Sequence, residues 1–226
     1  MKNNNVDKII KSSEQETPNI SVIENYVADA NALVILAHGA GADKSSEFMQ
    51  IMAELLNKHN INVLRFNFAY MDKRLADNKR YPPERMPKLL TCLQTVLEHV
   101  GTRLPLFLAG KSMGGRVAAT IVENKLDKVK GVMCLGYPFH PQKQPEKLRL
   151  DPLQKTKLPI LIVQGERDAL GNKSEINDYQ ISSLCEISFL ADGDHTLKPR
   201  IKSGYTHQQH LLSTVRLMHK FIVGHS

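Results

Sequence analysis

Short runs of apolar residues recur along the chain, and most are followed by glycine or polar residues and then by helix-like spacing. The run ALVILA at 32–37 is continuously apolar, which is typical of a strand buried on both faces of a parallel sheet. Apolar residues three and four positions apart predict helices beginning near Phe48 and Leu89. The same criteria predict strands at 20–27, 61–68, 104–109, 131–135, 159–164 and 184–190, and helices around 117–122 and 211–222.

The alternation of strands and helices predicts an α/β fold with a mostly parallel central sheet. Right-handed crossover connections would place helices on both faces of that sheet. The 226 residues contain no internal repeat and no low-complexity linker, so we expect a single domain over residues 20–226. Residues 1–19 are mostly polar, with few apolar side chains such as Ile9 and Ile10, and we expect a tail or the lead-in to an outer strand.

The chain lacks the sequence features of membrane-spanning and secreted proteins. No apolar run approaches the roughly 18 to 20 residues that a membrane span needs. The N-terminal segment also lacks the apolar centre of a secretory signal, so we expect a cytoplasmic protein without a membrane partner. Cys92, Cys134 and Cys185 form no C-x-x-C pair and no Cys/His pattern at zinc spacing, which predicts inert thiols and no metal.

The formal net charge of +7 raises the question of an anionic partner. The 30 lysines and arginines are spread along the chain, and no block of five or six occurs. We therefore expect a solvated basic surface and no nucleic-acid partner. A preference for anionic substrates stays open.

The strongest chemical motif is Gly110-Lys111-Ser112-Met113-Gly114, which directly follows one predicted strand and directly precedes a helix. A G-x-S-x-G pentapeptide in that position forms a sharp turn that exposes the serine oxygen above the sheet. The small residues on either side let the strand and the helix approach closely. The pattern predicts Ser112 as a nucleophile, and the alternative is a glycine-rich turn with a solvent-facing serine.

The letters GKS also occur at the end of the phosphate-binding loop G-x-x-x-x-G-K-[ST]. That motif requires a glycine at position 105, which is Pro105 in this chain. It also requires a loop where the sequence predicts a strand, so a nucleotide site is not expected.

A second motif, His38-Gly39-Ala40-Gly41-Ala42, directly follows the strand at 32–37. In a site of this kind, one N–H from this loop and the N–H that follows the nucleophile stabilise an oxyanion. The predicted donors are the backbone nitrogens of Ala40 and Met113. His38 is expected to brace the backbone, and the alternative is an ordinary flexible turn.

Two further strands end in residues that suit an acid and a base. Gly165-Glu166-Arg167-Asp168 follows the strand at 159–164, and we assign the acid to Asp168, with Glu166 as the fallback. His195 lies in the loop after the last predicted strand, where an imidazole could take the proton of a serine. The chain order Ser, Asp, His is the order expected for this arrangement.

Five segments together resemble the α/β-hydrolase superfamily: LAHGAGADKSSEFM at 36–49, VLRFNFAYM at 63–71, LFLAGKSMGGR at 106–116, LPILIVQGERD at 158–168 and GDH at 193–195. More narrowly, the sequence is similar to a dienelactone-hydrolase-like group of uncharacterised bacterial hydrolases related to the testis-expressed proteins. The resemblance covers the chain from about residue 30 onward. It implies Ser112 as nucleophile, Asp168 as acid, His195 as base and oxyanion amides near Ala40 and Met113. Dienelactone hydrolases proper use a cysteine nucleophile, so Ser112 puts that particular activity in doubt.

These observations lead us to expect a serine hydrolase that cleaves a small acyl substrate through an acyl-enzyme, without a metal or an organic cofactor. Two alternatives stay open: a non-catalytic binding or scaffold protein, and an acyltransferase or peptidase that uses the same three side chains. The oligomeric state is not predicted.

The substrate is the least determined property. Only 136–158 separate two predicted strands where related folds often insert a lid, so we expect little or no lid and one short helix. The stretch 70–87 is the other candidate for the rim of the site, and its basic residues, with Lys111, suggest an anionic acyl group. A small, open site would suit short esters or thioesters.

Overall fold

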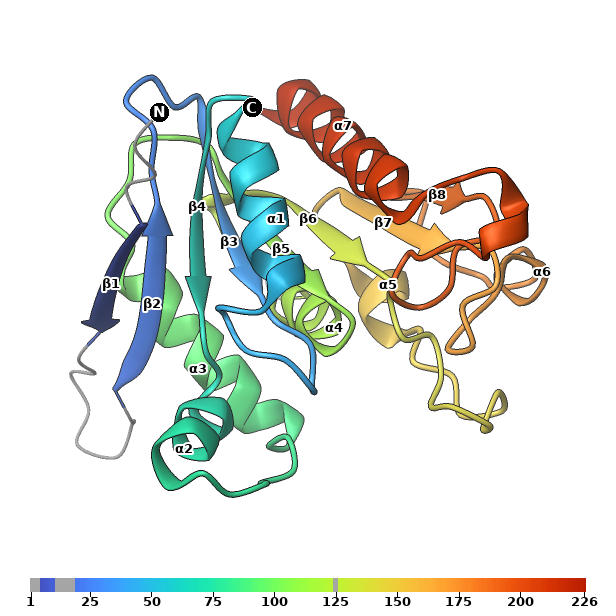
Figure 1. Ribbon diagram of the computed structural model, residues 1–226, viewed down its shortest axis with the longest axis horizontal. Coiled ribbons are helices and arrows are strands. Elements are labelled where there is room, and N and C mark those ends of the chain that lie inside the picture. Colours follow the sequence, from blue (N-terminus) through green and yellow to red (C-terminus); the bar gives the residue numbers. More distant parts are fainter. Residues whose placement is uncertain (1–4, 11–18, 124–125) are drawn as a thin grey trace.

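The computed structural model describes residues 5–10, 19–123 and 126–226. Its described strands form a single open sheet, in the order β1-β2-β4-β3-β5-β6-β7-β8 (Figure 1). Strands β1 and β2 run antiparallel to their neighbours, and the pairings from β4 to β8 are parallel. The strands are β1 (Asn5–Ile10), β2 (Ile20–Asn25), β3 (Ala32–Ala37), β4 (Ile61–Phe66), β5 (Leu106–Lys111), β6 (Val129–Leu135), β7 (Ile160–Gly165) and β8 (Cys185–Leu190). The predicted α/β fold class is confirmed.

Strand β1 lies inside the segment that the sequence analysis assigned to the polar N-terminal tail. It pairs with β2 from Asn5 opposite Asn25 to Ile10 opposite Ile20. Ile10 is buried whereas Ile9 is 66% exposed. Because so little apolar surface is buried here, hydrophobic periodicity carries almost no signal, and backbone pairing with β2 fixes the strand. Of the two expectations for this segment, a tail or the lead-in to an outer strand, the second is the nearer: residues 5–10 form an outer strand, and the rest of the segment, 1–4 and 11–18, lies outside the described residues.

Helices cover both faces of the sheet (Figure 1). Buried side chains of β3 alternate between them, so that Val34 and Leu36 contact one core cluster and Leu33 and Ile35 contact the other. This two-sided burial explains the continuous apolar run. The first cluster packs against α1 (Glu47–Asn57) and α7 (His207–His225); the second packs against α2 (Ala69–Asp77), α3 (Met86–His99), α4 (Met113–Ile121), α5 (Asp151–Lys155) and α6 (Lys173–Ile176).

Helix α2 was not predicted as a helix, because only Tyr70 and Met71 of its nine residues are buried. The short helix expected between 136 and 158 is α5, and the rest of the segment from β6 to α5 is a loop. Little or no lid is present there, as expected. Within the described ranges, we find no helix long and apolar enough to cross a bilayer.

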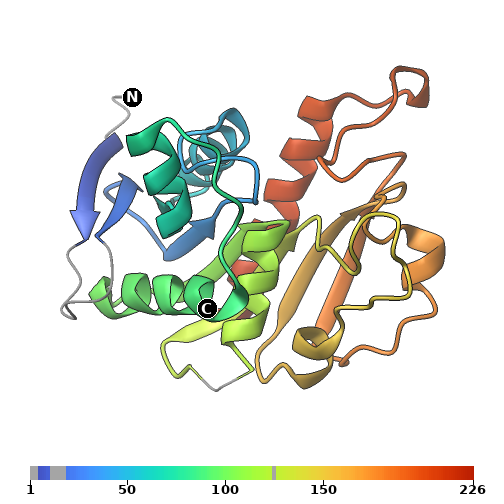
Figure 2. The same cartoon turned by 90° about the horizontal axis from the view of Figure 1, so that it is seen from below.

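The carboxyl ends of β3, β5, β6 and β7 meet at one edge of the sheet, since these neighbouring strands are parallel. Figure 2 views the molecule from this edge, with α4 near the centre, the α2 and α3 side to the left and β7 and β8 to the right. Ligand-binding residues in open α/β sheets are expected at such an edge.

Candidate active site

Ser112 lies in the tight turn between β5 and α4. Its backbone adopts φ 51° and ψ −113°, a conformation that side-chain-bearing residues rarely adopt. A Cβ on Gly110 would lie 2.2 Å from the carbonyl carbon of Gly114, and a Cβ on Gly114 would lie 2.5 Å from the carbonyl oxygen of Ala37. The glycines of the pentapeptide are therefore required because backbone approaches backbone on both sides of the serine.

The three side chains that the sequence singled out come together in a continuous chain of hydrogen bonds. His195 Nε2 lies 2.8 Å from Ser112 Oγ, and His195 Nδ1 lies 2.8 Å from Asp168 Oδ2. Since a carboxylate only accepts, the Nδ1–H donates to Asp168 and leaves Nε2 to accept from the serine hydroxyl. The three residues come from the loops after β5, β7 and β8. His195 lies 27 positions after Asp168 and 83 positions after Ser112 along the chain.

Asp168 is fully buried and held by more than its histidine. Its Oδ2 also accepts from Gln164 Nε2 at 2.9 Å, and its Oδ1 accepts from the Leu170 N–H at 2.8 Å. Gln164 in turn accepts from the Tyr137 N–H, at 2.8 Å. Gln164 was not predicted as a site residue, although a polar residue at the end of the otherwise apolar run PILIVQ is a signal that could have identified it.

Glu166, the fallback for the acid, does not contact His195. Its Oε1 accepts from Lys173 Nζ at 2.9 Å, and its Oε2 accepts from the Asp192 N–H at 3.0 Å. The hydrogen bond from Lys173 lowers the pKa of this carboxyl. Glu166 thus braces the base of the loop that carries the histidine.

The two backbone N–H groups assigned to the oxyanion belong to Ala40 and Met113. Met113 is the first residue of α4, where an N–H has no acceptor within the helix. In the described part of the chain, neither N–H donates a hydrogen bond. The Ala40 carbonyl oxygen accepts from Tyr70 Oη at 3.1 Å and from Arg74 Nη1 at 3.3 Å, which fixes this peptide unit. Both N–H groups can therefore donate to a ligand.

His38 braces the backbone, as the sequence analysis expected. Its Nδ1–H donates to the Gly39 carbonyl at 2.7 Å, and its Nε2 accepts from the Phe68 N–H at 3.1 Å. Burial lowers the pKa of this imidazole to about 4. A neutral ring joins the loop after β3 to the start of α2.

Lys111 connects the nucleophile turn to the histidine loop. Its Nζ donates to the carbonyl oxygen of His195 at 2.5 Å, across 84 positions of sequence. A Cβ on Gly136 would lie 2.8 Å from that Nζ, so the glycine leaves room for the ammonium. Burial of the ammonium lowers the pKa of Lys111 to about 8, although Asp168 and Asp194 act in the opposite direction. From the sequence, Lys111 was expected only as a positive charge beside Ser112.

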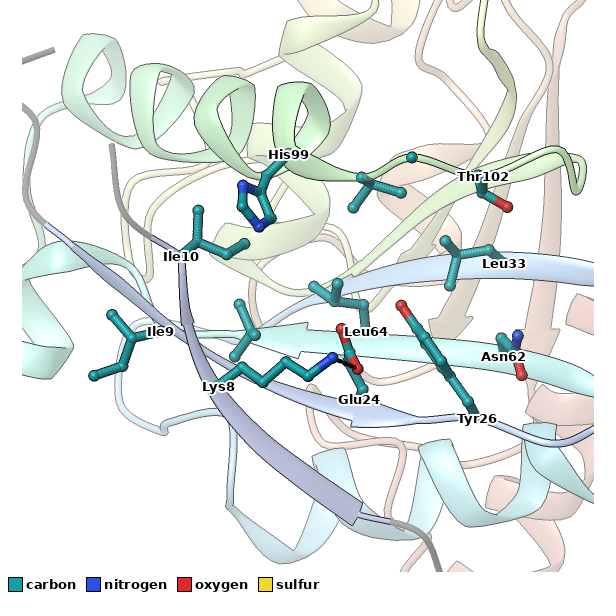
Figure 3. A pocket seen from close by; sticks show the side chains of 13 residues that line it. Lys8, Ile9, Ile10, Glu24, Tyr26, Leu33, Asn62, Leu64, His99 and Thr102 are labelled. Atoms are coloured by element: carbon teal, nitrogen blue, oxygen red, sulfur yellow. Dashed lines mark hydrogen bonds and ion pairs between the residues drawn. The ribbon is translucent and has the colours of Figure 1, made fainter. Parts of the chain in front are cut away.

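A cavity of about 300 Å³ lies at the edge of the sheet opposite to Ser112 (Figure 3). It is lined by residues near the amino ends of β3 and β4, such as Leu33 and Asn62, and by the Lys8–Glu24 ion pair of 2.6 Å. Because Ser112 follows the carboxyl end of β5, this cavity takes no part in the site.

The described residues contain no group of three or more His, Cys, Asp or Glu side chains that could hold a metal ion. Cys92 and Cys134 are buried, Cys185 is half-buried, and all three are free thiols. Burial raises the pKa of Cys92 to about 12 and that of Cys185 to about 11. At neutral pH these cysteines are protonated and weakly nucleophilic.

Comparisons with known proteins agree with the α/β fold. The family described as an alpha/beta hydrolase domain matches residues 30–223. A dienelactone hydrolase from Anabaena variabilis is 18% identical, with a TM-score of 0.75 over 99% of this chain and 98% of that one. An alpha-beta serine hydrolase homologue from Coxiella burnetii is 19% identical (TM-score 0.72, 98% of both chains), and Est1E from Butyrivibrio proteoclasticus is 14% identical (TM-score 0.70, 96% of this chain and 99% of that one). At these identities the structural likeness shows the fold alone.

Proposed function

The chain belongs to the alpha/beta hydrolase domain family, and we propose from this membership and its site geometry that it is a serine hydrolase for carboxylic esters, thioesters or similar acyl bonds. The observation that carries the proposal is the unbroken hydrogen-bond chain from Ser112 through His195 to buried Asp168. The superfamily resemblance seen in the sequence is confirmed. The finer assignment, an esterase-like enzyme, is the proposal.

The proposed reaction has two halves. Ser112 Oγ attacks the substrate carbonyl carbon while its proton passes to His195 Nε2, and the N–H groups of Ala40 and Met113 stabilise the oxyanion. The carbonyl re-forms, the bond to the leaving group breaks, and the leaving group takes the proton from His195. Water then repeats the sequence on the acyl-enzyme, which releases the acid and restores the serine. Asp168 holds the imidazole and stabilises its protonated form.

No step of this reaction requires a metal or an organic cofactor. We propose a small-molecule acyl substrate, no nucleic-acid or membrane partner, and action in the cytoplasm. The three free cysteines support a reducing compartment.

Replacement of the nucleophile tests the proposal. The Ser112→Ala variant is expected to lower kcat for p-nitrophenyl acetate by roughly 10⁴-fold or more, because it removes the attacking oxygen. Ser183→Ala is a matched control, since Ser183 is exposed and lies near the amino end of β8. Unchanged turnover in Ser112→Ala would refute the proposal.

A fluorophosphonate probe separates an enzyme from a non-catalytic protein on the same fold. Such a probe is expected to form an adduct at Ser112 in folded wild-type protein, and no adduct in Ser112→Ala. Absence of any adduct in folded wild-type protein would favour a binding or scaffold protein. A panel of ester, thioester and amide substrates, with and without an added acyl acceptor, then distinguishes an esterase from a peptidase or acyltransferase.

A further inference from the structure

A pocket of about 770 Å³ lies beside α2 and the start of α3, within the stretch that the sequence predicted as the rim of the site. We call it the α2–α3 pocket; its lining includes Tyr70, Tyr81, Pro82, Pro83, Glu84 and Pro87. Its volume falls in the range of pockets that bind small organic ligands. Two aromatic rings and three prolines give it a mostly apolar wall.

The wall of this pocket is hydrogen-bonded to the loop that carries the proposed oxyanion donor. Tyr70 Oη and Arg74 Nη1 both donate to the Ala40 carbonyl oxygen. Arg74 Nε also donates to the Tyr81 carbonyl oxygen at 2.5 Å. The pocket and the Ala40 peptide unit are therefore held together.

The order of strands places the pocket on the acyl side of Ser112. The elements around the pocket follow β4, whereas His195 follows β8, and these two strands lie on opposite sides of β5 (Figure 2). The leaving group must accept its proton from His195, so it departs on the β8 side. The acyl group then points away from His195, toward the β4 side and the α2–α3 pocket.

The polar groups of the pocket indicate what kind of acyl group it fits. Glu84 Oε2 is buried and has no hydrogen-bond partner within the described residues. Three cations also line the pocket: Lys73 lies 4.7 Å from the centre of the Tyr81 ring, whereas Arg85 and Lys88 are exposed at the surface. A buried acceptor without a donor is costly, and a ligand that donates a hydrogen bond would remove that cost.

Resting on the function proposed above, we infer that the α2–α3 pocket binds the acyl part of the substrate, a ring-sized apolar group with a hydroxyl that donates to Glu84. The rings of Tyr70 and Tyr81 contact the apolar body. An anionic acyl group, which the basic residues of 70–87 suggested, is the competing occupant: it would be attracted to exposed Arg85 and Lys88 of the lining but would lie beside the Glu84 carboxylate.

Four p-nitrophenyl esters with the same leaving group test the inference: acetate, 3-phenylpropionate, 3-(4-hydroxyphenyl)propionate and succinate. Wild-type protein is expected to show kcat/KM roughly 10- to 100-fold higher for the hydroxyphenyl ester than for the phenyl ester. This ratio corresponds to the contribution of one hydrogen bond to a charged acceptor. A ratio near one, or a preference for the succinate ester, would overturn the inference. If none of the esters is hydrolysed, the proposed function itself fails.

Substitution of Glu84 tests the assigned acceptor. In Glu84→Leu the hydroxyphenyl-to-phenyl ratio is expected to fall to about one, and because both esters share the ring and leaving group, a general loss of rate cancels in this ratio. Glu84→Gln keeps the side-chain shape and a hydrogen-bond acceptor, and it is expected to retain part of the preference. It replaces Glu84→Leu as the test variant if Glu84→Leu does not fold. Glu98→Leu, an exposed glutamate at the far end of α3, is the control and should keep the wild-type ratio. A preference that survives in Glu84→Leu would contradict the role of this side chain.

Discussion

At the scale of single residues, the proposed reaction depends on how firmly the surrounding residues hold His195. Its ring contacts Ser112 and Asp168, and its carbonyl oxygen accepts from Lys111 Nζ. The lysine stands one position before the nucleophile, so one short segment contacts both ends of the histidine. Lys111 is a positioning residue in this geometry, since it acts through the histidine loop and not on the substrate.

Removal of the Lys111 ammonium is expected to slow the reaction without unfolding the protein. Lys111→Met keeps most of the side-chain volume but loses the donor, and kcat should fall by roughly 10- to 100-fold with little change in KM, the scale seen for small misplacements of reacting groups. Thermal denaturation and the rate of fluorophosphonate labelling are measured alongside. The melting temperature should change little, because loss of the hydrogen bond to His195 is offset by loss of the desolvation cost of the buried ammonium.

Two comparison variants sharpen this prediction. Lys111→Arg keeps a donor and should recover part of kcat, whereas Lys130→Met removes an exposed lysine on β6 and should behave as wild type. If Lys111→Met turns over and labels at the wild-type rate, the carbonyl contact has no positioning role.

At the scale of elements, the turn between β5 and α4 is tightly constrained by its backbone contacts. The helix begins directly at the serine, and Gly114 brings its first turn against the Ala37 and His38 carbonyl oxygens at the end of β3. The nucleophile turn and the loop of the oxyanion donor are thus in backbone contact. Any side chain at position 114 would push these two elements apart.

Gly114→Ala is therefore expected to destabilise the protein and impair the site together. A Cβ there would lie 2.5 Å from the Ala37 carbonyl oxygen, which cannot move without shifting β3. Overpacking of this kind costs about 1–3 kcal/mol, which corresponds to a drop in Tm of roughly 3–10 °C for a chain of this length. Gly101→Ala, where a Cβ would meet no atom within 4 Å, is the matched control. Equal melting temperatures for the two variants would show that the close approach of Gly114 to the Ala37 carbonyl oxygen does not limit the stability of the protein.

At the scale of the whole molecule, the buried histidine of the loop after β3 couples folding to pH. Burial lowers the pKa of His38 to about 4 in the folded protein, against 6.5 for the unfolded chain. Between these values the unfolded state binds more protons, so stability is fully present above about pH 6.5 and is lost as the pH falls toward 4. Both hydrogen bonds of the ring hold the loop in place only while the ring is neutral.

The free energy of unfolding should accordingly fall by on the order of 3 kcal/mol between pH 6.5 and pH 4 on account of His38. Denaturant titrations at several pH values measure this slope. His38→Gln can still donate to Gly39 and accept from Phe68 but does not titrate, and its slope over this interval should be smaller. His99→Gln, an exposed histidine on α3, is the control and should keep the wild-type slope. An identical pH dependence in wild type and His38→Gln would contradict the prediction.

The sequence by itself determined the layered α/β fold and the three residues that meet at its edge. Continuous apolar runs such as 32–37 predicted buried parallel strands because both faces of the sheet are covered. Gly110 indicates a backbone constraint within the turn itself, since a Cβ there would lie 2.2 Å from the carbonyl carbon of Gly114. Once the strands are parallel, their carboxyl ends share one edge, so residues after β5, β7 and β8 could be expected to meet there.

Other features were decided only by the tertiary structure. The Lys111 contact with His195 and the Glu84 carboxylate in the α2–α3 pocket depend on which loops become neighbours, and the Gln164 contact with Asp168 depends on side-chain direction at the end of β7. Strand β1 depends on pairing with β2 and barely on its own side chains. Local patterns of hydrophobicity and glycine indicate local conformation, whereas residues such as Lys111 and His195, 84 positions apart, become neighbours through strand order and side-chain direction, which no local pattern specifies.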